Sequence, residues 1–297
     1  MDPQRILCPM NQQMITPQLV AQWLQDRRPD SHKGDYGRAL LVAGSRGMMG
    51  AALLSARACM RSGVGLLTVR APQCGYEILQ LGIPEAKCEC DECATHHASI
   101  CVPSGTEVIG IGPGLGQHPD TQQALHDVLV HTSLPMVLDA DALNILSLHP
   151  EWLSLVPAGT ILTPHPGEMK RLGGDVQSLV DRGLVVVFKG HQTRIYDGQN
   201  CYINELHGNA GMAVGGSGDV LTGIILALLA QHYAPQQAAV LGVWLHALAA
   251  DLALSDHNSM ESLLPSDIIA HLGEAFNHSR TDLIFSAVAF DTASCIR

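Results

Sequence analysis

Residues 208–219 read Gly-Asn-Ala-Gly-Met-Ala-Val-Gly-Gly-Ser-Gly-Asp, and apolar residues at helical spacing follow directly. Glycine permits positive φ angles and lets the backbone approach a ligand closely. A glycine loop that opens a helix leaves several N–H groups pointing outward at the positive end of the helix dipole. The stretch therefore predicts a loop-to-helix junction that binds an anion where the helix begins.

Asp219, at the end of this stretch, carries the wrong charge for an anion site. Two like unit charges about 4 Å apart repel by about 4 kcal/mol at an effective dielectric constant of about 20. If a phosphate binds the loop, Asp219 is expected to take a proton from the group that attacks the phosphate. Alternatively, Asp219 caps the helix. The loop alone leaves both interpretations open.

Two familiar nucleotide-binding motifs are excluded. A P-loop requires a Gly-Lys pair, and the chain contains none. Residues 44–50, Gly-Ser-Arg-Gly-Met-Met-Gly, follow an apolar run as a dinucleotide fingerprint would. Their glycines are spaced three and three instead of two and three, so the Rossmann fingerprint does not fit. This second loop is predicted to be a glycine turn between a strand and a helix.

The composition favours a globular protein with a large core, because 46% of the 297 residues are hydrophobic and 15% are charged. A formal net charge of −11 argues against nucleic acid or an anionic membrane as a partner. The first thirty residues lack a signal-peptide pattern, and the apolar stretch 224–230 is too short to span a bilayer. Nine cysteines, several in predicted core segments, suit a reduced cytoplasm.

Short apolar segments alternate with helical patterns along most of the chain. Strands are predicted over residues 39–43, 66–69, 107–111, 136–139, 160–163 and 185–189, and a hairpin over 193–203 with its turn at Asp197-Gly198. Helices are predicted over residues 17–25, 51–62, 121–130, 167–172, 220–231, 235–255 and 266–276. Strands that are apolar on both faces are typical of a parallel sheet covered by helices. We therefore predict one doubly wound α/β domain, with ligands beyond the carboxyl ends of the strands.

Polar clusters follow four successive strands at that edge. They are Gly112 to Gly116; Asp139, Asp141 and Asn144; Thr163 to Glu168; and Lys189 to Thr193. Together with the anion loop they favour a ligand site over ordinary turns.

Each member of these clusters also has a plainer explanation. Asp139 and Asp141 could cap a helix or bind backbone amides. Lys189 beside Gly190 suits a phosphate contact, or its side chain extends from the strand end towards water. Glu168 is either a carboxylate that favours a helix N-terminus or a group that binds Mg²⁺ through water.

Residues 88–101 form a cysteine-rich segment. Cys88, Cys90 and Cys93 lie beside His96 and His97, and Cys101 follows. Thiolates and imidazoles at such spacing can bind Zn²⁺, but one residue separates the first two cysteines, which is not the usual CxxC arrangement. We predict a polar, reduced loop without zinc, with a metal site as the alternative.

Seven motifs together resemble the NAD(P)H-hydrate dehydratase family, relatives of ribokinase that repair hydrated NADH and NADPH. They are HKGDYGR (32–38), AGSRGMMGAA (43–52), GIGPGLG (110–116), LDADALN (138–144), LTPHPGE (162–168), FKGHQT (188–193) and GMAVGGSGDVLTG (211–223). The resemblance covers residues 12–278 and implies a ribokinase-like fold. Many relatives carry a further N-terminal epimerase domain, for which the 297 residues leave no room.

The resemblance implies that ADP or ATP phosphorylates the ring hydroxyl of the S epimer of the hydrate, after which phosphate leaves and NAD(P)H is restored. Asp219 would be the base, and the N–H groups of Gly216, Ser217 and Gly218 would form the anion hole. The nucleotide would contact Lys189, Gly190, His191, Gln192, Thr193 and Gly218. The hydrate would contact Ala51, Gly114, Gly116, His165, Asn209 and Asp219.

The excess negative charge offers few cations for a polyphosphate, so Mg²⁺ is expected as a cofactor, with Glu168 binding it through water. The resemblance implies a homo-oligomer, with a tetramer favoured, and the expected location is the cytoplasm. The family loop more often has threonine where this chain has Val214 and Ser217. Two alternatives remain: a kinase of the same fold for a vitamin precursor or sugar, and a nucleotide sensor without catalysis. The preference for ADP or ATP stays open.

Overall fold

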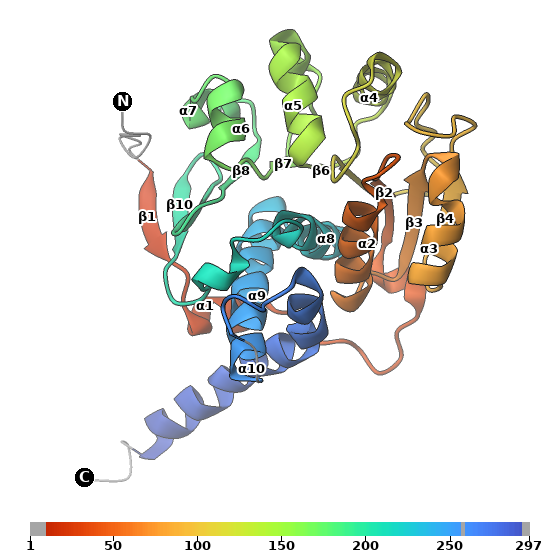
Figure 1. Cartoon of the computed structure of the whole chain (residues 1–297). Helices are drawn as coiled ribbons and strands as arrows, with labels where there is room; N and C mark the ends of the chain where they lie inside the picture. Colours follow the sequence, from red (N-terminus) through yellow and green to blue (C-terminus); the bar gives the residue numbers. More distant parts are fainter. Residues whose placement is uncertain (1–9, 257–258, 293–297) are drawn as a thin grey trace.

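The computed structural model describes residues 10–256 and 259–292, and within them a ten-stranded sheet forms the middle layer (Figure 1). The strand order is β1-β10-β9-β8-β7-β6-β5-β2-β3-β4. The strands are β1 (Asn11–Met14), β2 (Arg38–Val42), β3 (Leu66–Ala71), β4 (Lys87–Cys90), β5 (Val108–Ile111), β6 (Met136–Leu138), β7 (Ile161–Leu162), β8 (Val185–Phe188), β9 (Thr193–Tyr196) and β10 (Asn200–Asn204). Neighbouring strands are parallel except that β9 is antiparallel to both β8 and β10. The predicted, mostly parallel α/β sheet is confirmed.

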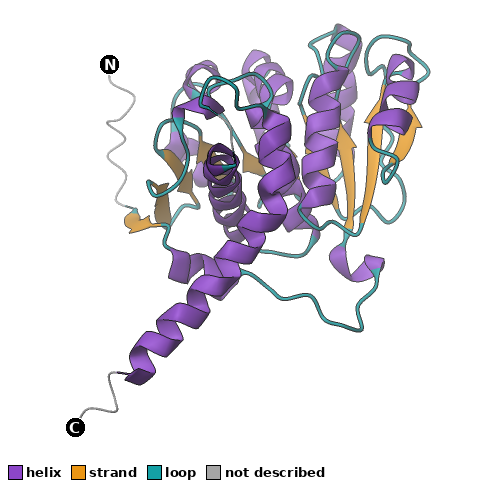
Figure 2. Cartoon of the chain, turned by 60° about the horizontal axis from the view of Figure 1, so that its bottom comes forward, coloured by secondary structure: helices purple, strands orange, loops and turns teal. Residues whose placement is uncertain are grey.

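Helices cover both faces of the sheet (Figures 1 and 2). They are α1 (Pro17–Trp23), α2 (Met49–Arg61), α3 (Tyr76–Gly82), α4 (Pro119–His131), α5 (Ala140–Leu148), α6 (Pro166–Arg171), α7 (Val176–Val180), α8 (Ser217–Ala230), α9 (Pro235–Ser255) and α10 (Pro265–Thr292). Helices α4 to α7 lie on one face, and α2, α8, α9 and α10 lie on the other. The chain is therefore doubly wound, as predicted.

The side chains of the strands contribute to two separate hydrophobic cores, because successive side chains point to opposite faces of the sheet. In β2, Ala39 and Leu41 join the core under α8, whereas Leu40 and Val42 join the core under α4 and α5. All four side chains are buried. Such a strand has no face for water, which explains its uninterrupted apolar sequence.

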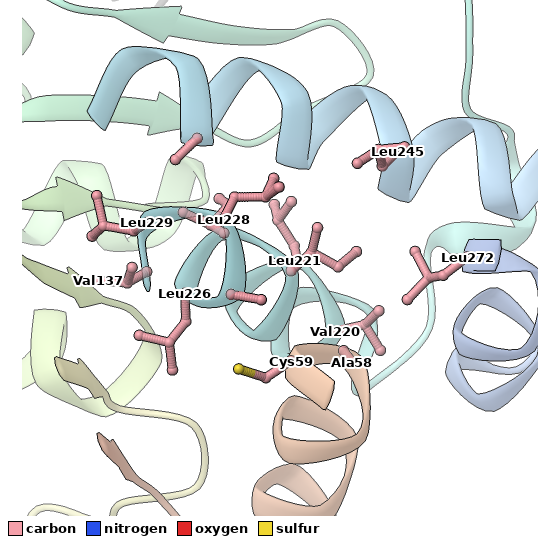
Figure 3. Packing of buried hydrophobic residues seen from close by; sticks show 14 of the residues in the cluster. Ala58, Cys59, Val137, Val220, Leu221, Leu226, Leu228, Leu229, Leu245 and Leu272 are labelled. Carbon is pink, nitrogen blue, oxygen red and sulfur yellow. The ribbon is translucent and has the colours of Figure 1, made fainter. Parts of the chain in front are cut away.

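Helix α8 is apolar around nearly its whole circumference, because it is covered from every side. It packs against α2, α9 and the sheet (Figure 3). Figure 3 shows Val220 and Leu226 of α8 on the side of α2 and the sheet, and Leu228 on the side of α9. This burial fixes the direction of the helix, and therefore where its N-terminus points.

Five elements were not predicted: β1, β4, α3, α5 and α7. The prediction of a loop over the whole of residues 88–101 is wrong, because Lys87–Cys90 pairs in parallel with β3. This strand is the last in the sheet order, and edge strands tolerate charged residues that hide their pattern. Helix α10 also continues to Thr292, beyond the predicted end at Phe276.

One described helix, α9, is long and apolar enough to cross a membrane by length and composition alone. In the structure 78% of its most apolar window is buried, so α9 is a core helix of this fold. The sequence prediction took residues 224–230 as the longest apolar stretch. The helix over residues 235–255 was predicted, but the length of its apolar run was not recognised.

The end of β5 is closely packed against the end of β6, and this contact generates a stability prediction. Gly112 has φ +134°, and a Cβ added there would lie 1.8 Å from the carbonyl oxygen of Asp139. We expect Gly112→Ala to lower the free energy of unfolding by about 2–4 kcal/mol, because both backbones must shift. Urea denaturation measures the change.

Gly50, in the first turn of α2, is the matched control for Gly112. An added Cβ there would meet no atom within 4 Å, and its φ is not positive. Gly50→Ala should leave the stability unchanged or raise it by up to about 1 kcal/mol. Equal stability of the Gly112→Ala variant and the parent protein would contradict the close contact.

Candidate active site

A cavity of about 800 Å³ opens beyond the carboxyl ends of β6 and β8, beside the start of α8. Its walls come from segments far apart in the sequence: the residues after β6, the start of α6, the residues after β8, and the glycine loop 207–216. This is the edge of the sheet at which the sequence predicts a ligand.

The anion loop ends in the predicted helix junction. Gly216 is the N-cap of α8 with φ +96°, and a Cβ there would lie 2.6 Å from Leu54 Cδ1, so only glycine fits. No side chain caps this end. The N–H of Ser217 donates to the Val214 carbonyl at 3.3 Å. The N–H groups of Gly216 and Gly218 have no hydrogen-bond partner within the part of the chain that the structure describes.

Asp219 lies in the first turn of α8 and lines the cavity. Its carboxylate makes no hydrogen bond to the helix N-cap, so the capping interpretation is not supported. Burial and, to a smaller extent, the negative charge of Asp139 raise the pKa of Asp219 to about 7, against the opposing charge of Lys189. A carboxylate that titrates near neutral pH is suited to accept a proton.

Asp139 and Lys189 form a buried ion pair next to this loop. Lys189 Nζ donates to Asp139 Oδ1 at 2.8 Å, and Thr222 Oγ1 of α8 donates to Asp139 Oδ2 at 2.7 Å. Burial alone would raise the pKa of Asp139, but the charge and hydrogen bond of Lys189 hold it below its usual value. Asp139 therefore binds side chains from β8 and α8, and does not cap α5.

Lys189 keeps its charge in this setting. Burial disfavours the charged amine, but the carboxylates of Asp139 and Glu168 more than compensate and raise its pKa. A Cβ added at Gly218 would lie 3.4 Å from Lys189 Nζ, so the ammonium group sits directly beside the anion loop. It faces the cavity with 20% of its side chain exposed.

Glu168 and His165 build the start of α6. Glu168 Oε2 accepts the backbone N–H of His165 at 2.8 Å, and His165 Nδ1 accepts the N–H of Gly167 at 2.9 Å. Glu168 is buried, which raises its pKa although Lys189 lies 3.8 Å away. Glu168 thus stabilises the N-terminus of α6, which was one of the two roles predicted for it. His165 lines the cavity.

The side chains of Asp141 and Asn144 are both hydrogen-bonded to other parts of the protein. Asp141 Oδ2 accepts the N–H of Gly116 at 2.9 Å, which fixes the loop after β5. Asn144 Oδ1 accepts two N–H groups of Arg171, at 3.0 and 2.7 Å. The plainer explanation therefore holds for Asp141.

The cavity gathers most, not all, of the predicted site residues. Those that line it are His165, Lys189, Gly190, His191, Thr193, Asn209, Gly216, Ser217, Gly218 and Asp219. Gln192 lies outside the lining and donates to Glu205 Oε1 at 2.7 Å. Ala51, Gly114 and Gly116 also lie outside it; a Cβ at Gly114 would meet Ala51 Cβ at 3.0 Å and Met48 O at 2.7 Å.

Sequence analysis missed three polar residues that hold the site. Thr222 binds Asp139, Asp251 binds the glycine loop, and His246 Nε2 lies 3.3 Å from Ser217 Oγ. The available signal was the interruption of two apolar helices by polar side chains. A polar group in such a helix requires a partner once it is buried.

The candidate zinc ligands of the cysteine segment divide into separate contacts. Cys88 and Cys90 on β4 have their Sγ atoms 3.7 Å apart. Cys93 Sγ lies 3.3 Å from His96 Nδ1. His97 is buried, and its Nε2 donates to the carbonyl of Gly44 at 3.0 Å.

His96 instead approaches the start of α4. Ligand atoms of His96, His118 and Asp120 lie within 4.8 Å of one another. The Nδ1 of His118 already accepts the backbone N–H of Asp120 at 3.2 Å, so this nitrogen serves as a helix cap. The absence of zinc stays a prediction.

The raised pKa of Asp219 generates a prediction about stability. The pKa of about 7 in the folded protein exceeds the unfolded value of about 3.9, so this group destabilises the fold progressively as pH rises from 4 to 7. An asparagine cannot ionise. Asp219→Asn should therefore match the parent protein near pH 4 and exceed its stability above pH 7, by up to about 4 kcal/mol.

Urea denaturation between pH 4 and pH 9 tests this prediction. Gly50→Ala is the control, because the substitution changes no ionisable group, and its stability relative to the parent should not depend on pH. A stability difference for Asp219→Asn that does not grow between pH 4 and pH 7 would show that Asp219 ionises normally.

The chain is similar to known proteins in both sequence and structure. A profile of the NAD(P)H-hydrate dehydratase family matches residues 39–272. The bifunctional NAD(P)H-hydrate repair enzyme of Vibrio cholerae is 40% identical over 267 residues, which is 86% of this chain and 52% of that enzyme. The chain thus spans about half the length of such bifunctional relatives.

One shorter relative matches over its whole length. The ADP-dependent (S)-NAD(P)H-hydrate dehydratase of Bacillus subtilis is 36% identical over 283 residues, which is 90% of this chain and 100% of that protein. A crystal structure of the B. subtilis ADP/ATP-dependent dehydratase, co-crystallised with ATP and Mg²⁺, aligns with a TM-score of 0.75 over 89% of this chain and 97% of that one.

The structure also resembles that of a ribokinase-like protein. A ribokinase-like superfamily protein from Enterococcus faecalis aligns with a TM-score of 0.79 at 29% identity, over 90% of this chain and 96% of that one. The ribokinase-like architecture expected from the motifs is therefore confirmed. By both sequence and structure, the chain belongs to the NAD(P)H-hydrate dehydratase family.

Proposed function

We propose that this protein is an ADP- or ATP-dependent NAD(P)H-hydrate dehydratase, a hydro-lyase that acts on the S epimer of the hydrate. The observation that carries the proposal is Asp219, a carboxylate with a pKa of about 7 that follows an anion loop with free N–H groups. The family membership and the full-length match to the B. subtilis dehydratase support the choice of substrate.

The first step would be phosphoryl transfer. Asp219 takes the proton from the hydroxyl on the hydrated nicotinamide ring, and the oxygen attacks the terminal phosphoryl group of ADP or ATP. The N–H groups of Gly216 and Gly218 stabilise the negative charge on the transferred group. The Ser217 N–H would join them by exchanging its 3.3 Å bond to Val214 for one to phosphate.

The second step would be elimination. The ring C–O bond breaks and inorganic phosphate leaves with the former hydroxyl oxygen. The dihydronicotinamide double bond re-forms as the adjacent carbon loses a proton. The products are NAD(P)H and phosphate, with AMP from ADP or ADP from ATP. Phosphorylation is useful because phosphate is a far better leaving group than hydroxide.

The nucleotide would bind along the cavity wall after β8. Gly190, His191 and Thr193 line this wall, and Lys189 presents its charge beside Gly218. Lys189 would remain paired with Asp139 while it contacts phosphate, since its side chain lines the cavity, is 20% exposed, and places Nζ beside Gly218. Gln192 lies at the margin and would contribute least.

The hydrate would bind across the neighbouring strand ends. His165 and Asp219 line the cavity there, and the Asn209 side chain, which is held by Asp251, would act through the position of its loop. Ala51, Gly114 and Gly116 lie outside the cavity lining, and Ala51 and Gly114 are buried, so their contact with the hydrate rests on the family resemblance. The Gly116 loop is fixed there by Asp141.

Mg²⁺ would accompany the nucleotide and neutralise its phosphate charge. Both oxygens of Asp139 and Oε2 of Glu168 accept hydrogen bonds from the protein, so neither carboxylate is open as a bidentate ligand. This donor set fits an ion held by phosphate oxygens and water, with Glu168 behind the water. A cytoplasmic location rests on the cysteine content, and a homo-oligomer, with a tetramer favoured, rests on the family resemblance.

We expect Asp219→Asn to lower kcat by about 10²–10⁴-fold, because the general base is lost. Affinity for ADP should stay within a few-fold of the parent value, since the anion loop is unchanged and a negative charge is removed. The rise in absorbance of NADH on mixing protein, hydrated NADH, Mg²⁺ and nucleotide measures turnover, and calorimetry measures binding. Near-normal turnover would mean that another group is the base.

Metal removal gives a second functional prediction. Among the described residues, the cavity lining holds two carboxylates, those of Asp139 and Asp219, and a single lysine that is already paired with Asp139, so a polyphosphate needs a further cation. EDTA should stop turnover, and added Mg²⁺ should restore it. Full activity in thoroughly chelated protein would contradict this requirement.

A further inference from the structure

Two side chains of helix α9, His246 and Asp251, contact the two ends of the glycine loop. The helix is buried along most of its length, and its residues 238–250 are apolar or glycine apart from His246. Asp251 follows one residue later. These two polar side chains point at segments on either side of the loop that carries the anion site.

His246 contacts the start of α8. Its side chain is buried, lines the cavity, and places Nε2 3.3 Å from Ser217 Oγ. Burial and the nearby charge of Lys189 lower the pKa of His246 to about 4. The ring is therefore neutral at physiological pH, with one N–H and one lone pair, and can either donate to the serine hydroxyl or accept from it.

Asp251 contacts the beginning of the loop. Its Oδ2 accepts from His207 Nδ1 at 3.1 Å and from the Gly208 N–H at 3.0 Å, and its Oδ1 accepts from Asn209 Nδ2 at 2.9 Å. Burial would raise the pKa of Asp251, but these hydrogen bonds hold it below its usual value. One carboxylate thus fixes three successive residues.

We propose that His246 and Asp251 are positioning residues, which hold the two ends of the anion loop on α9 so that its N–H groups point at the transferred phosphoryl group. The proposal rests on the proposed function for the identity of the anion. Neither side chain need touch a reacting atom.

The physical reason is the composition of the loop. Five glycines between residues 208 and 218 make it costly to order, because glycine loses the most backbone freedom on folding. Donors that stabilise a developing charge act best when their direction is fixed before the reaction. A rigid, buried helix such as α9 can supply that fixation through two anchors.

The experiment compares His246→Leu, which keeps volume but loses the hydrogen bond, with His246→Gln, whose amide can reach the Nε2 position. We expect His246→Leu to weaken ADP binding and kcat about tenfold, as for the loss of one buried hydrogen bond, and His246→Gln to recover most of the loss. Asp251→Asn should weaken ADP binding by a similar factor, since its amide NH₂ cannot accept a hydrogen bond and leaves at least one of the three donors without an acceptor.

Ser279→Ala is the matched control. Ser279 Oγ accepts the Trp244 Nε1–H of α9 at 3.1 Å, outside the loop. The variant loses a buried hydrogen bond of the same helix, so its stability should fall while ADP affinity and kcat stay unchanged. If His246→Leu and Asp251→Asn behave like Ser279→Ala, their role is structural only and the proposal is wrong.

A double variant tests the link between His246 and Ser217. Ser217→Ala combined with His246→Leu should lose no more ADP affinity than the worse single variant, because both remove the same contact. Additive losses would contradict it. ADP affinity is read by calorimetry without turnover, so the anchor is tested even if the parent protein fails to convert hydrated NADH, an outcome that would overturn only the proposed function.

Discussion

The buried ion pair between Asp139 and Lys189 is the interaction on which the site depends. It joins the end of β6 to the end of β8, and Thr222 adds α8 to the same carboxylate. Removing one partner would leave an unpaired buried charge, which typically costs about 3–5 kcal/mol. The pair therefore fixes three elements around the cavity and sets the field in which Asp219 titrates.

Asp219 lowers the stability of the folded protein when its carboxylate is ionised. Its pKa of about 7 means that the folded protein holds an ionised carboxylate that it disfavours, close to Asp139 and at the edge of an anion loop. Lys189 offsets part of that cost without neutralising Asp219, since its hydrogen bond goes to Asp139. The same pKa near neutral pH allows Asp219 to act as a base. The apolar packing of α8 against α2 and α9 holds Asp219 in this position.

The central strands, the hairpin and the anion loop could be predicted because their patterns are local. Gly216 and Asp219 follow from glycine geometry and charge, and Lys189 from its place after a strand. The contacts of His246, Asp251 and Thr222 could not be predicted, because they join residues that are 29 to 83 positions apart. They depend on how the helices pack together, which local sequence patterns do not reveal. Strand β4 was missed because an edge strand carries no apolar pattern.

The path of the ring oxygen tests the central claim most directly. Hydrated NADH labelled with ¹⁸O in its ring hydroxyl, incubated with the protein, Mg²⁺ and ADP, should give phosphate that carries one ¹⁸O atom, together with AMP and NADH in equal amounts. Phosphoryl transfer to the hydroxyl followed by elimination requires this result. Label recovered in water, with unlabelled phosphate, would contradict the proposed transfer from the anion loop.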